Sequence, residues 1–341
     1  MIWAEAEGCR VVDAEGRSYI DLSGGFGVAA LGHRNSEIEA AVLSQARRCM
    51  HALGDLAEAD TAIRLRERLG ADGREAMLGV TGEDAVEIAL RTALLVTSRP
   101  GIVAFDGAYH GTGLLALAAT GFEHFRAPFE AWLPGPVHRR PYGEDPGPLP
   151  SDTACVIVEP VQGRAGSRVP RDGFLETLRA RCDEAGALLV ADEIYTGLGR
   201  TGQLWRSGDV ADLVTCGKAL GGGLPISACL MRPEHRAAWN FGPEDVYTHT
   251  HMGNPLAAAA ALVVLERVPS LCERVREAGE RFEAAGWHGV GLLRAKEGDA
   301  FAAWERGVIV IPAGEDGRYM SATPPLTITD AEIDEALERI G

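Results

Sequence analysis

Lysine is almost absent from this 341-residue sequence, although basic residues are not. Of the 33 lysines and arginines, only Lys218 and Lys296 are lysines, so arginine carries nearly all of the positive charge. Any chemistry that requires a lysine amine therefore has only these two candidates.

The sequence also lacks the features that mark nucleic-acid-binding, membrane and secreted proteins. Its formal net charge is −16, which argues against binding to nucleic acids or to anionic membranes. No apolar run approaches the ~20 residues of a membrane span, and the longest, at 255–265, predicts a buried helix. The first residues lack a basic segment followed by an apolar one, so we expect no signal peptide and a cytoplasmic location.

Cysteine pairing patterns are missing as well. The 7 cysteines are an odd number, and they form no C-x-x-C pair. We therefore expect no disulfide framework, no metal site and a reducing compartment.

Short apolar runs alternate with helical patterns through the middle of the chain. Strands are predicted at 102–105, 155–158, 188–191, 213–215 and 228–231, with helices at 85–96 and 173–185 between them. This order is typical of an α/β fold with a mainly parallel sheet. Functional residues of such sheets gather beyond the carboxyl ends of the strands, here at Glu159, Asp192 and Lys218.

The flanking segments show turn and cap patterns. Residues 9–12 and 18–21 predict a hairpin, and the proline-rich segment 134–150 predicts a surface loop. A final helix is expected from Asp330, with Thr329 or Asp330 itself as its cap.

Lys218 has the surroundings of a functional amine. Its neighbours at 214–226 are mostly apolar residues and glycines, whereas Lys296 has charged neighbours and resembles a solvated surface residue. An apolar setting lowers the pKa of a lysine and makes it a usable nucleophile, and the glycines allow close approach of a ligand.

Three other positions carry weaker patterns. Asp192 ends an apolar run, where a buried carboxylate either caps a turn or holds a pyridinium nitrogen protonated. Gly82 lies at a predicted helix start, which can bind phosphate through free N–H groups, although most such starts bind nothing. His110 follows a strand, where it either packs in the core or forms a platform for a ring.

In this order, these motifs resemble those of the class III aminotransferases. That family of fold-type-I pyridoxal 5′-phosphate (PLP) enzymes includes ornithine, acetylornithine and 4-aminobutyrate aminotransferases. The matching segments are 12–25, 31–33, 108–111, 158–163, 192–202, 217–223, 253–257 and 324–329. The resemblance implies a mainly parallel seven-stranded sheet with helices on both faces and a smaller α+β domain. It also implies a large PLP-binding domain at 36–252 and a small domain built from 1–35 and 253–341.

The resemblance assigns roles at the cofactor. Lys218 would form the Schiff base and move the proton, and Asp192 would pair with the pyridine nitrogen. The ring would lie between Ile194 and Tyr109. Thr250 would reach the phosphate of the partner subunit, which implies a homodimer with active sites at its interface.

The remaining cofactor contacts also follow from the resemblance. Gly82 and Glu83 would offer backbone N–H groups to the phosphate, with the Glu83 carboxylate turned away. Tyr195, where the family often has glutamine, would donate its hydroxyl to the phenolic oxygen of the ring. His110 and Glu159 complete the expected cofactor-binding set.

The substrate pocket departs from the family pattern. Thr112 and Ser321 stand where ornithine-type relatives have arginines, and Arg164 stands where they have a glutamate. We expect Arg164 to take over carboxylate recognition, with pairing to an acid such as Glu193 or exposure to solvent as the alternatives. Phe26 would make the pocket more apolar.

The resemblance implies a cytoplasmic, biosynthetic PLP-dependent aminotransferase. It would move an amino group from an amine or amino acid to a keto acid or aldehyde by a ping-pong mechanism. Two alternatives stay open: an aminomutase of the glutamate-1-semialdehyde type, and a catalytically idle dimeric binding protein of the same fold.

Overall fold

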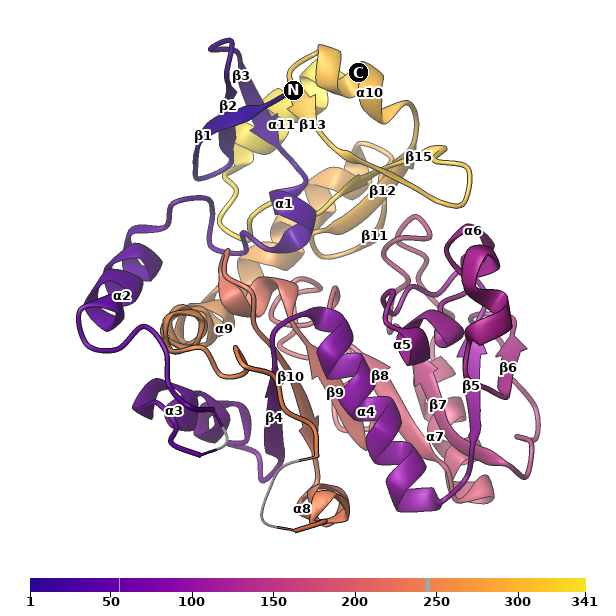
Figure 1. Cartoon of the computed structure of the whole chain (residues 1–341). Helices are drawn as coiled ribbons and strands as arrows, with labels where there is room; N and C mark the ends of the chain where they lie inside the picture. The colour runs from indigo at the N-terminus through magenta and orange to yellow at the C-terminus, as the bar shows by residue number, and fades with distance from the viewer. Residues whose placement is uncertain (55, 243–245) are drawn as a thin grey trace.

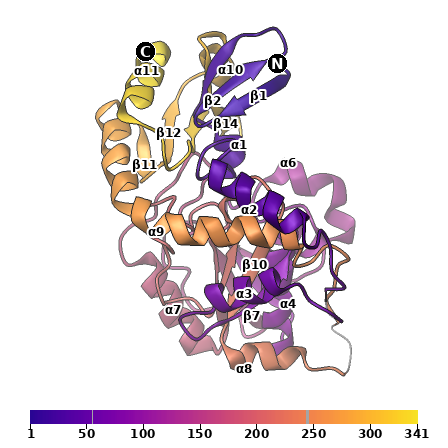
Figure 2. The same ribbon diagram turned by 90° about the vertical axis from the view of Figure 1, so that its left-hand side faces the viewer.

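The computed structural model describes residues 1–54, 56–242 and 246–341. A large sheet with its helices makes the lower part of the view in Figure 1, and both chain termini lie in the upper part. The two parts are seen from the side in Figure 2.

Seven strands form the large sheet in the order β4-β10-β9-β8-β7-β5-β6. They are β4 (Glu75–Gly79), β5 (Gly101–Phe105), β6 (Val137–Arg140), β7 (Thr153–Val158), β8 (Leu188–Asp192), β9 (Leu213–Cys216) and β10 (Ser227–Met231). Strand β10 runs antiparallel to both neighbours, and the other pairings are parallel. The prediction of a mainly parallel seven-stranded sheet is confirmed.

Helices cover both faces of this sheet, because its strands bury side chains on both sides. Ile102 and Ala104 of β5 pack toward α4 (Gly82–Thr97), whereas Val103 joins the core beneath α7 (Phe174–Ala185). Each fully buried valine or isoleucine of this kind contributes roughly 1.5–3 kcal/mol to the free energy of unfolding. The central strands β5 and β7 therefore consist almost entirely of apolar residues.

The remaining helices complete the two layers and the upper part. They are α1 (Gly24–Gly27), α2 (Ser36–Ala46), α3 (Asp60–Leu69), α5 (Leu114–Ala119), α6 (Glu123–Arg126), η1 (Ala127–Trp132), η2 (Lys218–Gly221), α8 (Pro233–Arg236), η3 (Ala237–Trp239), α9 (Pro255–Ala284), α10 (Ala300–Glu305) and α11 (Asp330–Ile340). Thr329 caps α11 in a capping box with Glu332, so Thr329 is the cap of the two residues considered.

The sequence did not predict the two strands at the opposite edges of the large sheet. Strand β6 lies inside 134–150, where a surface loop was predicted, and that prediction is wrong at 137–140. Its residues are half-buried and mostly basic because β6 is an edge strand beside β5. Strand β4 is short and pairs only with the antiparallel β10.

Two four-stranded sheets form the upper part. One contains β1 (Trp3–Glu7), β2 (Arg10–Asp13), β3 (Ser18–Asp21) and β13 (Val308–Ile309); the other contains β11 (His288–Val290), β12 (Leu293–Glu297), β14 (Ile311–Ala313) and β15 (Tyr319–Ala322). The predicted hairpin is the β2–β3 pair, and β13 joins β3 in parallel, which brings the two chain ends together. The division of the chain at residues 36 and 253 stays a prediction.

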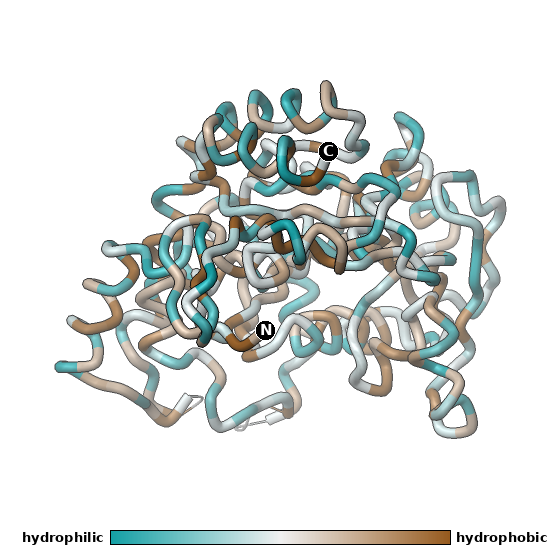
Figure 3. The backbone as a smooth tube through the Cα atoms, turned by 90° about the horizontal axis from the view of Figure 1, so that it is seen from above, coloured by the Kyte–Doolittle hydropathy of each residue, from teal (hydrophilic) through white to brown (hydrophobic). Residues whose placement is uncertain are grey.

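The predicted buried helix at 255–265 is the first part of α9. By length and composition α9 could cross a membrane, but half of its most apolar window is buried inside the protein. It packs against α2 and α3, as a core helix does (Figure 2). In the coloured part of the tube in Figure 3, hydrophobic and hydrophilic segments are interspersed.

Candidate active site

A cavity of about 540 Å³ opens beyond the carboxyl ends of the central strands. Its walls are formed by α1, by the start of α4 and by strands β14 and β15. The loops that follow β5, β7, β8 and β9 complete them. The lining residues are Phe26, Thr81, Gly82, Glu83, Tyr109, His110, Gly111, Glu159, Gly163, Arg164, Asp192, Ile194, Tyr195, Lys218, Ile311, Pro312, Ala313 and Ser321. The structure thus brings together every predicted site residue except Thr250.

Lys218 enters the cavity directly after β9. Its φ of 38° is a left-handed backbone conformation that non-glycine residues rarely adopt, and such strain concentrates at functional sites. Burial lowers the pKa of its amine, while the nearby carboxylates Asp192 and Glu159 oppose that shift. The amine Nζ lies 4.4 Å from the centroid of the Tyr195 ring. Lys218 is therefore a desolvated amine held against an aromatic face.

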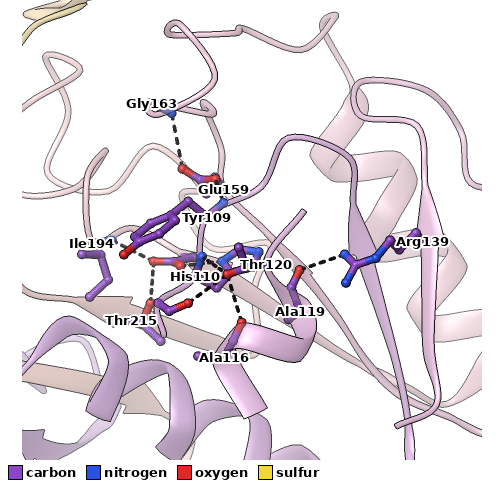
Figure 4. Close-up of polar contacts among 12 residues, drawn as sticks. Tyr109, His110, Ala116, Ala119, Thr120, Arg139, Glu159, Gly163, Ile194 and Thr215 are labelled. Carbon is purple, nitrogen blue, oxygen red and sulfur yellow. Dashed lines mark hydrogen bonds and ion pairs between the residues drawn. The ribbon is translucent and has the colours of Figure 1, made fainter. Parts of the chain in front are cut away.

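Asp192, the last residue of β8, is buried and held by three donors. Its Oδ1 accepts hydrogen bonds from the Thr215 hydroxyl and the Ile194 amide, both at 3.1 Å. Its Oδ2 accepts from Nδ1 of His110 at 2.7 Å (Figure 4). One acceptor position on Oδ2 remains for a further donor.

The His110 ring lies at the base of the cavity and is directed at Asp192. The imidazole is buried and hydrogen-bonded through its edge, as a packed residue is, and a role for it as a platform for a ring stays a prediction. Its backbone N–H donates to the Thr120 hydroxyl at 3.0 Å, which fixes the turn after β5 (Figure 4).

Glu159, at the end of β7, supports the same turn. Its Oε1 accepts from the Tyr109 amide at 2.8 Å and its Oε2 from the Gly163 amide at 3.3 Å (Figure 4). Burial raises the pKa of this carboxyl to about 7, an effect that the neighbouring Asp192 strengthens and His110 opposes. The pKa of Glu159 is thus close to neutral pH.

The first turn of α4 presents free amides to the cavity. Thr81 and Asp84 form a capping box that satisfies the N–H groups of residues 80, 81 and 84. Within the described part of the chain, the amides of Gly82 and Glu83 find no protein acceptor. Free amides at a helix start bind anions such as phosphate.

The Glu83 carboxylate does point away from this position, as expected. Its Oε2 accepts from the Thr112 amide at 3.0 Å, the Thr112 hydroxyl at 3.1 Å and the Gly113 amide at 3.0 Å. One turn later, Glu87 accepts from the amides of residues 115 and 116 at the start of α5. Two glutamates of α4 therefore hold the loop that follows His110.

Tyr195 fills a slot between glycines. A Cβ added at Gly163 would overlap its ring, and one at Gly27 would lie 3.0 Å from Cε2. Its hydroxyl is 3.3 Å from that of Thr323, which itself donates to the Ser23 carbonyl. The residue therefore joins the large sheet to the upper part of the molecule.

The remaining predicted residues lie farther out. Phe26 is 57% exposed at the cavity rim, and Arg164 reaches the cavity from the loop after β7. Arg164 does not pair with Glu193, whose carboxylate binds Thr196 and Ser207 instead. Thr250 is exposed and lies outside the cavity of its own chain.

The chemistry of the lining residues fits a phosphorylated pyridine aldehyde. The cavity combines a desolvated lysine amine, a buried carboxylate with a vacant acceptor position and two free helix-start amides. The backbone of Gly82 and the side chain of Ile194 lie close together across the site, because a Cβ at Gly82 would lie 3.1 Å from Cγ2 of Ile194. The three groups would hold the aldehyde carbon, the ring nitrogen and the phosphate of PLP.

Comparison with known proteins decides the family. The family model described as Aminotransferase class-III matches residues 1–285. The chain belongs to the class III aminotransferases. It is 37% identical to an acetylornithine aminotransferase of Methanopyrus kandleri, over 98% of this chain and 92% of that protein. It is 32% identical to a 4-aminobutyrate aminotransferase of Escherichia coli, over 98% and 91%.

The fold agrees with this membership. The ornithine aminotransferase of Toxoplasma gondii superposes with a TM-score of 0.91 at 27% identity, covering 99% of this chain and 89% of the other. That enzyme holds PLP at partial occupancy in its active site. This class III aminotransferase is therefore a fold-type-I, PLP-dependent transaminase, and the aminomutase and the idle binding protein are not favoured.

Three features of the site went unnoticed in the sequence. They are the His110–Asp192 pair, the clamp of Glu83 on Thr112 and the Tyr195–Thr323 contact. Each joins residues at least 29 positions apart, so no local pattern signals it. Only the departures from the family pattern at Glu83 and at Tyr195, where the family often has glutamine, marked these positions as unusual.

Proposed function

We propose that this enzyme transfers an amino group from an amine or amino acid to a keto acid or aldehyde by a ping-pong mechanism at the cavity described above. One observation carries the proposal: Lys218, Asp192 and the free amides of Gly82 and Glu83 line a single cavity. A lysine, a carboxylate and an anion site are the three protein groups that PLP chemistry requires.

The cofactor contacts are proposed residue by residue. Lys218 carries PLP, Asp192 pairs with the ring nitrogen, and Ile194 and Tyr109 cover the two faces of the ring. The amides of Gly82 and Glu83 bind the phosphate. When bound, PLP supplies an electron sink for the bond broken at the substrate α-carbon.

The protein groups around the ring perform supporting tasks. His110 holds the Asp192 carboxylate in place, and Asp192 in turn accepts a hydrogen bond from the protonated ring nitrogen. Lys218, once free, moves a proton at the substrate α-carbon, and its lowered pKa makes the neutral amine available as the base. The Tyr195 hydroxyl, near Thr323, turns to the phenolic oxygen of the ring only if that contact opens.

The assembly and the compartment are further parts of the proposal. The enzyme is a homodimer in which Thr250, exposed in the single chain, completes the phosphate site of the partner subunit. All seven cysteines are free thiols, which supports a reducing, cytoplasmic location. The altered arginine set suggests a specialised biosynthetic role, without 2-oxoglutarate as the obligatory acceptor.

Spectroscopy tests the proposal. The enzyme loaded with PLP should show the visible absorbance of a lysine-bound cofactor, lose it with an amine donor and regain it with a keto acid. The two half-reactions should run separately, with the keto product of the donor released before the acceptor is added. An absorbance that no amine changes would refute the proposal, and return of the amino group to the same molecule would indicate an aminomutase.

A further inference from the structure

Arg164 is held by aromatic faces rather than by an acid. Its guanidinium carbon lies 4.9 Å from the ring centroids of Tyr109 and Phe125 and 6.0 Å from that of Phe122. No side chain of the described ranges forms an ion pair or a hydrogen bond with it. Rings that cover the faces of a guanidinium leave its edge donors free for an acceptor in its plane.

Ser321 is a second donor without a partner in the same cavity. Its residue is 2% exposed, and its Oγ has no hydrogen-bond partner among the described residues. A buried hydroxyl without a partner is costly, so it points to a missing ligand. Ser321 lies on β15 opposite Ile311 of β14, and the Gly314 amide that follows β14 donates to the Arg164 carbonyl at 2.9 Å. The two donors thus come from adjoining, hydrogen-bonded segments.

The remaining charges of the cavity limit what a substrate can carry. Its cations are Arg164 and Lys218, and its acids are Glu83, Glu159 and Asp192. Because Lys218 serves the cofactor, Arg164 is the one cation left for the substrate among the described lining residues of this chain. A second substrate carboxylate would meet acids or the apolar wall, which consists of Phe26, Ile311, Pro312 and Ala313.

We propose that Arg164 and Ser321 form a site for one carboxylate, and that this aminotransferase selects monocarboxylic amino and 2-oxo acids with uncharged, largely apolar side chains. The inference rests on the proposed function and names its substrate class. The edge of the guanidinium binds the carboxylate in its plane, and the serine hydroxyl donates the additional hydrogen bond. Dicarboxylates such as 2-oxoglutarate leave their second charge without a counter-ion.

A matched pair of acceptors tests the selection. The two acids 2-oxopentanoate and 2-oxoglutarate have the same five-carbon chain and differ by one carboxylate. The homogeneous enzyme in its amino form should use 2-oxopentanoate with a kcat/KM at least about 10-fold higher. Equal or better use of 2-oxoglutarate would overturn the proposal.

Variants test the residues. Arg164→Gln should lower kcat/KM for 2-oxopentanoate at least about 30-fold, mainly through KM, because a charge pair is lost. Ser321→Ala should cost about 3- to 10-fold. Arg171→Gln removes an exposed arginine of the same loop and is the matched control. With an amine donor that lacks a carboxylate, Arg164→Gln should lower kcat/KM far less than it does for 2-oxopentanoate; an equal loss with this donor would assign Arg164 a structural role and overturn the proposal.

Calorimetry separates this inference from the proposed function. Pentanoate and glutarate are unreactive, so their binding to the PLP-loaded enzyme is measured without turnover. Pentanoate should bind more tightly than glutarate, and Arg164→Gln should weaken the binding of pentanoate at least about 30-fold. Tighter binding of glutarate than of pentanoate would overturn the inference even in an active transaminase. Equal pentanoate affinity in wild type and Arg164→Gln would do the same. Failure of the proposed function would instead appear as cofactor absorbance that no amine changes.

Discussion

Nδ1 of His110 lies 2.7 Å from Oδ2 of Asp192, in the interior beneath the cavity. The two residues come from the loop after β5 and from the end of β8, which are separated by β7 in the sheet. The imidazole N–H holds the carboxylate in one orientation. In the proposed function Asp192 pairs with the cofactor nitrogen, and His110 positions Asp192 for that contact.

The first prediction concerns this pair. Asp192→Asn should lower kcat by at least about 1,000-fold, because a neutral amide does not keep the ring nitrogen protonated. His110→Phe should cost about 10- to 100-fold, which is the range for a hydrogen bond to a charged group. His110→Asn, which keeps a donor near the Nδ1 position, should recover part of that loss. Near-normal turnover of Asp192→Asn would make the residue a structural cap.

The second prediction concerns Glu159 and pH. Its carboxyl has an ordinary pKa of 4.5, and burial raises the pKa to about 7 in the folded protein. The folded state therefore binds the proton of Glu159 more tightly than the unfolded state does. This tighter binding stabilises the fold fully below pH 4.5, and the stabilisation is lost as pH rises through 7. Glu159→Gln stays neutral. The quantity to compare is the free energy of unfolding of Glu159→Gln minus that of wild type, both without cofactor. This difference should rise by about 1–3 kcal/mol from pH 5 to pH 8.

Urea unfolding at a series of pH values measures that difference. Glu5→Gln, on an exposed strand, is the control for the substitution itself. A pH-independent difference between Glu159→Gln and wild type would contradict the prediction.

The third prediction separates two effects of Glu83. Glu83→Ala removes the acceptor for the amides of Thr112 and Gly113 and should lower the free energy of unfolding by about 1–3 kcal/mol. Glu83→Gln keeps an acceptor but removes a negative charge beside the phosphate site, so it should bind PLP at least as tightly as wild type. Weaker PLP binding by the Gln variant would show that the carboxylate itself is needed.

The fourth prediction tests the shared active site. Thr250→Ala should weaken PLP binding by about 10-fold, the effect of one hydrogen bond to a charged group, whereas Thr248→Ala should have no effect. Mixed dimers of Thr250→Ala and Lys218→Ala chains should contain one intact site, because each chain supplies what the other lacks. Purified mixed dimers should therefore bind PLP at one site with wild-type affinity, and should show about half of the wild-type activity at a PLP concentration that leaves Thr250→Ala homodimers largely empty. Mixed dimers whose PLP affinity is as weak as that of Thr250→Ala homodimers, or an active monomer, would refute a shared site.

Much of this molecule could be predicted from its sequence because the signals are local. The apolar runs that became β5, β7, β8, β9 and β10 indicated the strands of the sheet, and the glycine-rich surroundings of Lys218 marked the reactive amine. Strand β6 lacked such a run, because edge positions tolerate polar residues; strand β4 has only the short apolar run Ala76–Leu78 and contains no β-branched or aromatic residue.

The rest depended on contacts between distant segments. Tyr195 meets Thr323 across 128 positions, and His110 meets Asp192 across 82. The aromatic cage of Arg164 draws on Tyr109 and Phe125, which the sequence places far from it. Such contacts follow from the packing of whole layers and leave no periodic trace in the sequence.

The central claim is that Lys218 carries PLP in this cavity, and the scarcity of lysine makes it unusually direct to test. The PLP-loaded enzyme is reduced with borohydride, digested and mapped by mass spectrometry. We predict the pyridoxyl label on the peptide that contains Lys218, and an inactive but folded Lys218→Ala variant without label. A label on Lys296, or no label on either lysine, would contradict the claim.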